Sequence, residues 1–189
     1  MEVPSEVIEG CKAGDQESFK ELIRLTHRAV YSLALRMVGD PEDAADVSQE
    51  TYLKLIRAIK QFRGEAKFST WLYRVTSSVA ISSLRKKSRR RADVPIDSED
   101  LTRLPAVATA DPAVSSEQRF LMERLDKALQ QLPASYRVVA VMKDVYGLSF
   151  EEIADQLAIN EGTARVRLHR ARRRLRELLS EDALEEPGA

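Results

Sequence analysis

Cysteine and histidine, which build most disulfides and zinc sites, are nearly absent from this chain of 189 residues. A single cysteine, Cys11, excludes an internal disulfide. Because His27 and His169 are the only histidines, a zinc cluster cannot be assembled from Cys and His alone. This cysteine usage is typical of a protein of the reducing cytosol.

Long apolar runs and catalytic motifs are missing as well. No stretch of about 18 apolar residues is present to span a bilayer, and the N-terminus MEVPSEVIEG lacks the basic and then apolar layout of a signal peptide. We therefore expect a cytoplasmic protein without direct membrane insertion. The sequence has no phosphate-binding glycine loop, no GxSxG and no HExxH, so no class of enzyme, cofactor or metal site is indicated.

Net charge is also absent, because 30 Lys and Arg balance 30 Asp and Glu, but the charges are unevenly distributed. Two blocks are strongly basic, 85–91 (RKKSRRR) and 165–176. Acidic residues gather between them, at 93–111, and in the C-terminal tail. Such segregation predicts separate surfaces for separate partners, and the basic blocks are typical of nucleic-acid binding.

Domain organisation follows from glycine and proline, which are sparse except in one segment. Residues 92–115 carry three prolines, many small or acidic residues and no sustained period, which predicts an extended acidic linker. Helical periodicity dominates on both sides, without a convincing strand or an internal repeat. We predict an all-α fold of two small helical domains, 1–91 and 116–182, with a tail at 183–189.

The N-terminal domain is predicted to contain three helices. The first ends at Gly39, and Asp40 caps the second, with Pro41 at its first position. Ser69 or Thr70 caps the third, which runs into the first basic block. Their core faces are Phe19, Leu22, Ile23, Val30, Leu33, Ala34, Met37 and Val38; then Val47, Thr51, Leu55, Ile59 and Phe62; then Trp71, Leu72, Val75, Val79 and Leu84.

The C-terminal domain is predicted to contain four helices. Ser115 and Gln118 open the first. Pro133 begins the second, which Gly147 ends. The inward residues are Leu121, Leu125, Ala128, Leu129 and Leu132 in the first helix, and Val138, Val139, Met142, Val145 and Tyr146 in the second.

The last two helices form a helix-turn-helix candidate. Ser149 and Glu152 make a capping box before a short helix, and Asn160 can cap the next one. Arginines crowd the outer faces of that second helix, which suits phosphates and base edges in a DNA major groove. A solvated amphipathic helix is the alternative. The apolar stripe of this helix consists of Ala164, Leu168, Ala171, Leu175 and Leu178.

An aromatic segment of the N-terminal domain leads into its basic helix. Aromatic faces beside cations suit the unpaired bases of an opened strand. Core packing is the alternative for these rings, so the loop 63–67, where Gly64 allows a turn, is the better candidate for base contact. The aromatic residues are Phe62, Phe68, Trp71 and Tyr73.

Acidic and amide side chains share one face of the second predicted helix: Asp43, Asp46, Gln49 and Glu50. A solvated helix face, acid–base chemistry and a cation site are alternatives for this patch. Because a negative patch repels DNA on a chain with two DNA-like surfaces, a protein partner fits it best.

Three motifs in this order resemble a bacterial RNA polymerase sigma factor of the extracytoplasmic-function (ECF) group of the sigma-70 family. They are the DAxDxxQExY helix, the FRGExxFxTWL loop and the EGTxxxRLHRAR helix. The resemblance implies a factor that does no covalent chemistry. It would bind core RNA polymerase, recognise the minus-ten and minus-thirty-five promoter elements, and promote melting of promoter DNA.

The resemblance also implies the residues that make these contacts. The clamp helices of the largest polymerase subunit would bind the helix face that carries Asp43, Asp46, Gln49 and Glu50. Minus-ten recognition and melting would use Phe62, Arg63, Gly64, Glu65, Ala66, Lys67, Phe68, Ser69, Thr70, Trp71, Tyr73, Arg74, Ser78 and Arg85. Minus-thirty-five recognition would use Thr163, Arg165, Val166, Arg167, His169, Arg170 and Arg173. The polymerase flap region and an anti-sigma factor are further implied partners.

Departures from the family pattern affect both DNA surfaces. In the third helix, serines replace the family's Arg-Asn pair and a later Asp, which predicts an altered base pocket. The turn of the helix-turn-helix carries alanine where glycine is frequent. In the recognition helix, alanine and valine replace the usual valine and serine, which predicts an unusual minus-thirty-five sequence. The departing residues are Ser77, Ser78, Ser82, Ala158, Ala164 and Val166.

Two other functions compete with this interpretation. A stand-alone helix-turn-helix regulator that binds duplex DNA as a dimer leaves the acidic patch without a role. An enzyme acting on nucleic acid requires catalytic carboxylates or metal ligands beside a basic groove.

Overall fold

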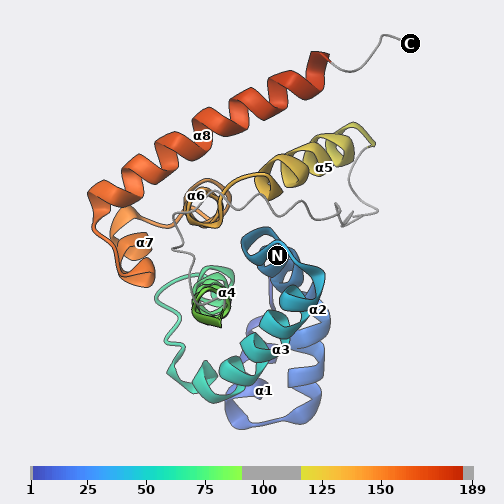
Figure 1. Cartoon of the computed structure of the whole chain (residues 1–189). Coiled ribbons are helices and arrows are strands. Elements are labelled where there is room, and N and C mark those ends of the chain that lie inside the picture. The colour runs from blue at the N-terminus through green and yellow to red at the C-terminus, as the bar shows by residue number, and fades with distance from the viewer. Residues whose placement is uncertain (1, 91–115, 185–189) are drawn as a thin grey trace. The chain divides into compact units, whose positions relative to one another are not determined.

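The regular structure of the chain is entirely helical over residues 2–90 and 116–184, which the computed structural model describes (Figure 1). The chain divides into two compact units, Met1–Lys87 and Ser88–Ala189. The prediction of an all-α protein with two small helical domains is confirmed. The predicted linker, 92–115, lies outside the described residues.

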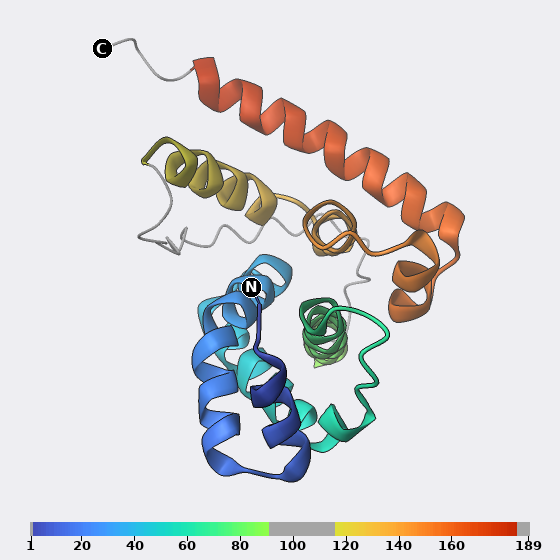
Figure 2. The same ribbon diagram turned by 180° about the vertical axis from the view of Figure 1, so that it is seen from behind.

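Four helices and one short turn build the first unit, and α1 packs against α2, which in turn packs against α3 (Figure 1, Figure 2). Their caps are local. Gly39 ends α2 in a left-handed conformation, and the Asp40 carboxylate accepts the amides of Glu42 and Asp43 at 3.0 Å, as predicted. The elements are α1 (Ser5–Ala13), α2 (Gln16–Val38), α3 (Pro41–Ala58), the 3₁₀ turn η1 (Ile59–Gln61) and α4 (Phe68–Arg90).

Two features of this unit differ from the sequence prediction. Helix α1 was not predicted; it is short and begins after Pro4 without a side-chain cap. Helix α4 begins at Phe68, so the prediction of Ser69 or Thr70 as its cap is wrong. The Trp71 amide already donates to the Lys67 carbonyl, and the buried Phe68 fixes the first turn in the core.

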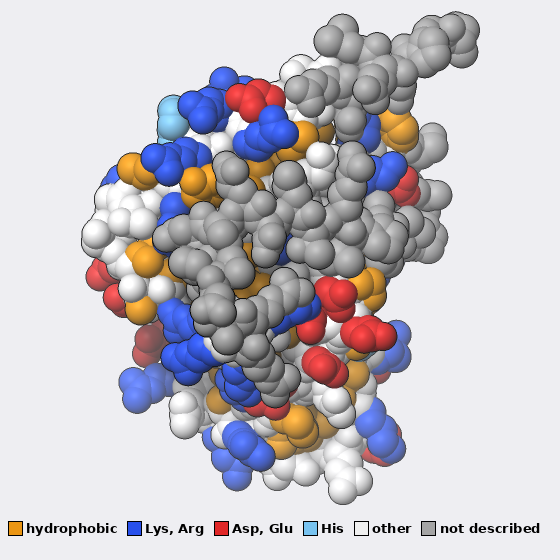
Figure 3. All heavy atoms as spheres, in the orientation of Figure 1, with side chains coloured by type: hydrophobic (Ala, Val, Ile, Leu, Met, Phe, Trp, Pro, Cys, Tyr) orange, Lys and Arg blue, Asp and Glu red, His pale blue; other side chains and the backbone are white. Residues whose placement is uncertain are grey.

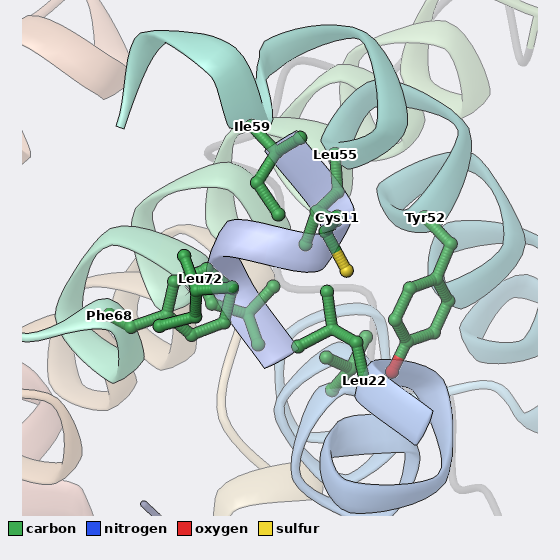
Figure 4. Close-up of a cluster of buried hydrophobic side chains, with 9 residues drawn as sticks. Cys11, Leu22, Tyr52, Leu55, Ile59, Phe68 and Leu72 are labelled. Carbon is green, nitrogen blue, oxygen red and sulfur yellow. The ribbon is translucent and has the colours of Figure 1, made fainter. Parts of the chain in front are cut away.

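The core of the first unit joins all four helices (Figure 4). Tyr52 is the polar member of this cluster, and its hydroxyl lies 2.9 Å from the Thr26 hydroxyl. Burial raises the pKa of Tyr52, and the hydrogen bond with Thr26 opposes that rise. The cluster consists of Ile8, Cys11, Leu22, Val30, Tyr52, Leu55, Ile59, Phe68 and Leu72.

The second unit contains the predicted four helices, with one irregularity. Its elements are α5 (Ser116–Gln130), α6 (Ala134–Ala140), the π-helical turn η2 (Val141–Val145), α7 (Phe150–Leu157) and α8 (Glu161–Leu184). Both α5 and α7 pack against α8, which also contacts α6. The second predicted helix is therefore an α-helix that widens into a π turn before Gly147 ends it.

Two predicted core residues of the second unit are exposed. Val145 lies outward because the wider π turn rotates it away from the face of Val138 and Met142. Leu121 is exposed because α5 enters the core through its C-terminal part, where Ala128 and Leu129 are buried. The predictions for Val145 and Leu121 are wrong.

A buried arginine joins α5 to α6. The Arg137 guanidinium donates to the carbonyl of Gln130 at 3.3 Å and to its side-chain oxygen at 3.2 Å, at the C-terminal end of α5. Burial lowers the pKa of Arg137 to about 10, so the side chain stays charged at neutral pH. The arginine thereby donates to a carbonyl at the C-terminal end of α5, where cationic side chains commonly bind the last carbonyls of a helix.

Candidate functional site

The helix-turn-helix has the local geometry that its sequence predicts. The Glu152 amide donates to the Ser149 hydroxyl at 3.1 Å, and the Ser149 amide donates to the Glu152 carboxylate at 2.7 Å, which completes the capping box. The Asn160 side chain accepts the Thr163 amide at 2.7 Å and so caps α8. Both predicted caps are confirmed.

The turn between α7 and α8 contains a non-glycine residue in the left-handed region. Ala158 has φ 52°. Its amide donates to the Asp155 carbonyl, and the Ile159 amide donates to the Ala154 carbonyl. This pair of bonds is the Schellman ending of a helix, in which glycine normally takes the left-handed position. Ala158 therefore carries backbone strain at the bend of the motif.

Helix α8 packs on the unit through the predicted stripe, in which Ala164, Leu168, Ala171 and Leu178 are buried. Val166, His169 and Arg173 recur on the opposite, exposed face at spacings of three and four. Val166 is 50% exposed, so it presents an apolar side chain on this face. Figure 3 shows Lys and Arg side chains gathered over this helix.

Contacts with the rest of the unit restrain several arginines of α8. The Arg170 guanidinium donates to the Tyr136 hydroxyl at 3.1 Å. Arg172 forms a two-pronged ion pair with Asp144, which raises the pKa of Arg172. Arg165 pairs with Glu161 one turn earlier and lies over the Phe150 ring. Among the predicted minus-thirty-five residues, Arg167 is half-buried and Thr163 belongs to the Asn160 cap.

Phe62, Phe68 and Trp71 form a triangle of rings at the start of α4. The ring centroids of Phe62 and Phe68 are 5.3 Å apart, and those of Trp71 lie 5.5 Å from Phe62 and 5.6 Å from Phe68. Phe68 is buried in the core, and the other two pack partly against it. Core packing therefore accounts for these rings, as the alternative interpretation expected.

The loop in front of this triangle is exposed at every position from 63 to 67. Gly64 has φ 77°, and a side chain there would meet open space, so the turn rather than crowding calls for glycine. The loop is thus solvated, and Phe62 and Phe68 of the ring triangle flank it in the sequence. Besides Gly64 it contains Arg63, Glu65, Ala66 and Lys67. The Lys12 ammonium of α1 lies over the Phe62 ring, 5.7 Å from its centroid.

The remaining predicted minus-ten residues follow along α4. Arg74 and Ser78 are exposed, whereas Tyr73 is half-buried and burial raises its pKa. Ser69, Thr70 and Arg85 are also half-buried. At the family's arginine position, the Ser77 hydroxyl is buried without a hydrogen-bond partner, which shows that this side of α4 faces the core.

The polar face of α3 is outward at three of its four predicted positions. Asp46, Gln49 and Glu50 are exposed. Asp43 differs, since its side chain is only 27% exposed and forms an ion pair with Lys87 of α4. The prediction of an outward patch is therefore corrected at Asp43, which joins two helices within the unit.

Two apolar residues that the sequence reasoning missed continue this face. Leu53 is 47% exposed and Ile56 is 46% exposed. Leu53 lies four residues after Gln49, and Ile56 lies three residues after Leu53, so both share the outer side of α3. Their positions outside the core stripe of an otherwise amphipathic helix were the signal in the sequence.

The described ranges contain neither a metal-binding cluster nor a membrane-spanning helix. In residues 2–90 and 116–184, no group of three or more His, Cys, Asp or Glu could hold a metal ion. No helix of these same residues has the length and apolarity to cross a membrane.

Comparison with known families covers both units. The family described as "Sigma-70 region 2" matches residues 22–90, and "Sigma-70, region 4" matches residues 122–175. The chain belongs to the sigma-70 family, in its ECF group. This sigma factor is accordingly a promoter-specific transcription initiation factor that binds core RNA polymerase, and the family is not one of catalytic enzymes. No comparison supports a stand-alone regulator.

Individual relatives are similar in sequence to this sigma factor over most of its length. It is 34% identical to the ECF RNA polymerase sigma factor SigW of Bacillus subtilis over 91% of the chain and 94% of SigW. It is 31% identical to the RNA polymerase sigma-H factor of Pseudomonas aeruginosa over 91% of both chains. It is also 35% identical to the longer ECF sigma factor SigE of Mycolicibacterium smegmatis, of which it covers 66%.

Solved structures show the same fold. RpoE of Bartonella quintana, in complex with the anti-sigma factor NepR, is 25% identical with a TM-score of 0.60, over 87% of this sigma factor and 98% of RpoE. CnrH, in complex with the cytosolic domain of CnrY, is 22% identical with a TM-score of 0.53, over 93% of this chain and 96% of CnrH.

Proposed function

We propose that three surfaces divide the work of initiation in this sigma factor. The outer face of α3 docks on the clamp helices of the largest polymerase subunit. The loop 63–67 and the neighbouring α4 face capture opened bases of the minus-ten element. The exposed face at the start of α8 reads the minus-thirty-five element.

The chemistry of the α3 face carries the assignment to polymerase. Asp46 and Glu50 are exposed carboxylates, and Leu53 and Ile56 extend the same face with large apolar side chains. An apolar centre with polar groups beside it is typical of a protein interface, whereas carboxylates repel DNA phosphates. Asp43 contributes indirectly, because its ion pair with Lys87 ties α3 to the basic end of α4.

Base capture fits the loop because the aromatic residues that flank it are packed in or against the core. The ring triangle of Phe62, Phe68 and Trp71 is anchored in the core, so the exposed loop can receive an unstacked base without losing its shape. Melting then draws on binding energy, since protein contacts replace lost stacking worth a few kcal/mol for each flipped base. The exposed Ser78 offers a short hydroxyl where the family pattern has an asparagine. No nucleotide hydrolysis is required.

Duplex recognition fits the outward face of α8. Arg165, Arg170 and Arg173 are exposed there, and cations of this kind bind phosphates and guanine edges. His169 is exposed on the same face. Val166 lies among them and offers an apolar surface to a thymine methyl group.

The polymerase assignment is tested by capture of purified core polymerase. The variant that combines Asp46→Ala with Glu50→Ala should bind core polymerase at least about tenfold more weakly, because two interface carboxylates are lost. The matched control combines Glu6→Ala with Glu9→Ala, which removes the same charge from exposed positions of α1. Undiminished capture by the α3 variant contradicts the assignment. Equal weakening of binding by the control variant also contradicts it, because net charge then explains the effect.

Two further expectations accompany this function. Because RpoE and CnrH are each found in complex with a second protein, we expect an anti-sigma factor as an additional partner of this chain. Action on core polymerase places the factor in the cytoplasm. Docking on the polymerase flap region stays a prediction.

A further inference from the structure

The start of α7 and the start of α8 meet through an aromatic ring. Phe150 is the first residue of α7, and its ring lies under the guanidinium of Arg165 of α8, with 4.4 Å between the guanidinium carbon and the ring centroid. This distance is well inside the range in which a cation is attracted to an aromatic face. The contact links the supporting helix of the motif directly to a side chain of the recognition helix.

The ring itself is held in place by its neighbours. The capping box of Ser149 and Glu152 fixes the backbone on both sides of Phe150. The Lys143 ammonium lies over the same ring at 5.0 Å and donates to the Leu148 carbonyl at 2.9 Å. Phe150 is half-buried between these groups. The platform under Arg165 therefore does not depend on a bound partner.

Arg165 retains donors for DNA in this arrangement. One terminal nitrogen of its guanidinium donates to the Glu161 carboxylate, while the Arg165 side chain is 59% exposed. A guanidinium has several N–H donors arranged in a rigid fork, so the donors that do not bind Glu161 remain available. The ring and the carboxylate together restrict a long side chain that would otherwise sample many rotamers.

We propose that Phe150 is a positioning residue for minus-thirty-five recognition, which it serves by orienting Arg165 before DNA binds. The inference rests on the proposed role of α8 in reading that element. Phe150 does not itself touch DNA in this mechanism. Replacing Phe150 should weaken specific binding through lost orientation of Arg165, without any change of charge.

The experiment uses the holoenzyme with a promoter selected by it in vitro, and the same DNA with its minus-thirty-five element replaced. Phe150→Leu should lower the ratio of the two affinities by about two- to fivefold, the range that an exposed cation–π contact provides. Phe150→Tyr keeps the ring and should restore the wild-type ratio. Phe120→Leu is the matched control, because it removes another ring under a cation, Arg124 at 5.7 Å, in the same unit.

A double-mutant cycle separates positioning from a general effect on structure. In the background of Arg165→Ala, the change Phe150→Leu should cause no further loss, whereas a structural defect would add the same loss in both backgrounds. An unchanged ratio for Phe150→Leu, or an equal loss in both backgrounds, overturns the positioning role. An unchanged ratio for Arg165→Ala alone instead overturns the assignment of this face of α8 to the minus-thirty-five element.

Discussion

Replacing Ala158 by glycine should stabilise the second unit. An L-residue in the left-handed region costs roughly 1–2 kcal/mol, and glycine removes this cost but loses about 0.5–1 kcal/mol more backbone freedom on folding. Ala158 is exposed, and its cap bonds come from the backbone, so the substitution loses no packing and no hydrogen bond. The free energy of unfolding should therefore rise by about 0.5–1 kcal/mol.

Thermal unfolding of the full chain measures this effect. For a unit of this size the gain corresponds to a rise of about 2–8 °C in the midpoint of the transition followed by amide hydrogen exchange in α7 and α8. Trp71, the only tryptophan, reports the other unit by fluorescence, and its transition should not move. An unchanged or lower midpoint for α7 and α8 would refute the assignment of strain to this turn.

The reverse substitution, glycine to alanine at another left-handed position, serves as the control. Gly147 also has a positive φ, 71°, and an added side chain there meets open space within 4 Å. Gly147→Ala should therefore lower the same midpoint through backbone strain alone, by about 1 kcal/mol in the free energy of unfolding. If both variants leave the midpoint unchanged, the left-handed conformation carries no measurable cost in this unit.

The remaining predictions concern a buried arginine and an exposed valine. Arg137→Ala should reduce the free energy of unfolding of the second unit by about 2–4 kcal/mol, because it removes both hydrogen bonds from the guanidinium to Gln130 and opens a cavity. A loss below about 1 kcal/mol in denaturant titrations would contradict this role. Because Val166 is exposed, the holoenzyme should bind DNA with thymine at one minus-thirty-five position more tightly than DNA with deoxyuridine there, by about 0.8 kcal/mol or roughly fourfold in affinity. Val166→Ser should abolish this difference. Equal binding of the two bases by the wild type at every position would refute a methyl contact.

Local signals explain most of what the sequence predicted. Gly39 with Asp40, Ser149 with Glu152, and Asn160 act through bonds within a few residues, so their roles can be read from spacing alone. The apolar stripe of α8 is likewise a local pattern of period 3.6.

Packing determines what the sequence did not show. The π turn of η2 depends on how its residues meet the rest of the unit, and periodicity therefore placed Val145 on the wrong face. The pairs Asp43 with Lys87 and Phe150 with Arg165 join different helices, and no spacing rule predicts such pairs. The missed helix α1 has too few residues for a strong periodic signal.

Helix α1 extends the folded first unit beyond the N-terminal limit of the family match. The family match starts at residue 22, yet Ile8 and Cys11 lie in the same core cluster as Phe68, and Lys12 lies over the Phe62 ring. A chain shortened to start at Leu22 would keep every residue assigned to DNA and polymerase, but it would leave the back of the ring triangle open to water. We therefore expect residues 2–21 to support the loop proposed for base capture, although none of them is assigned a contact with DNA or polymerase.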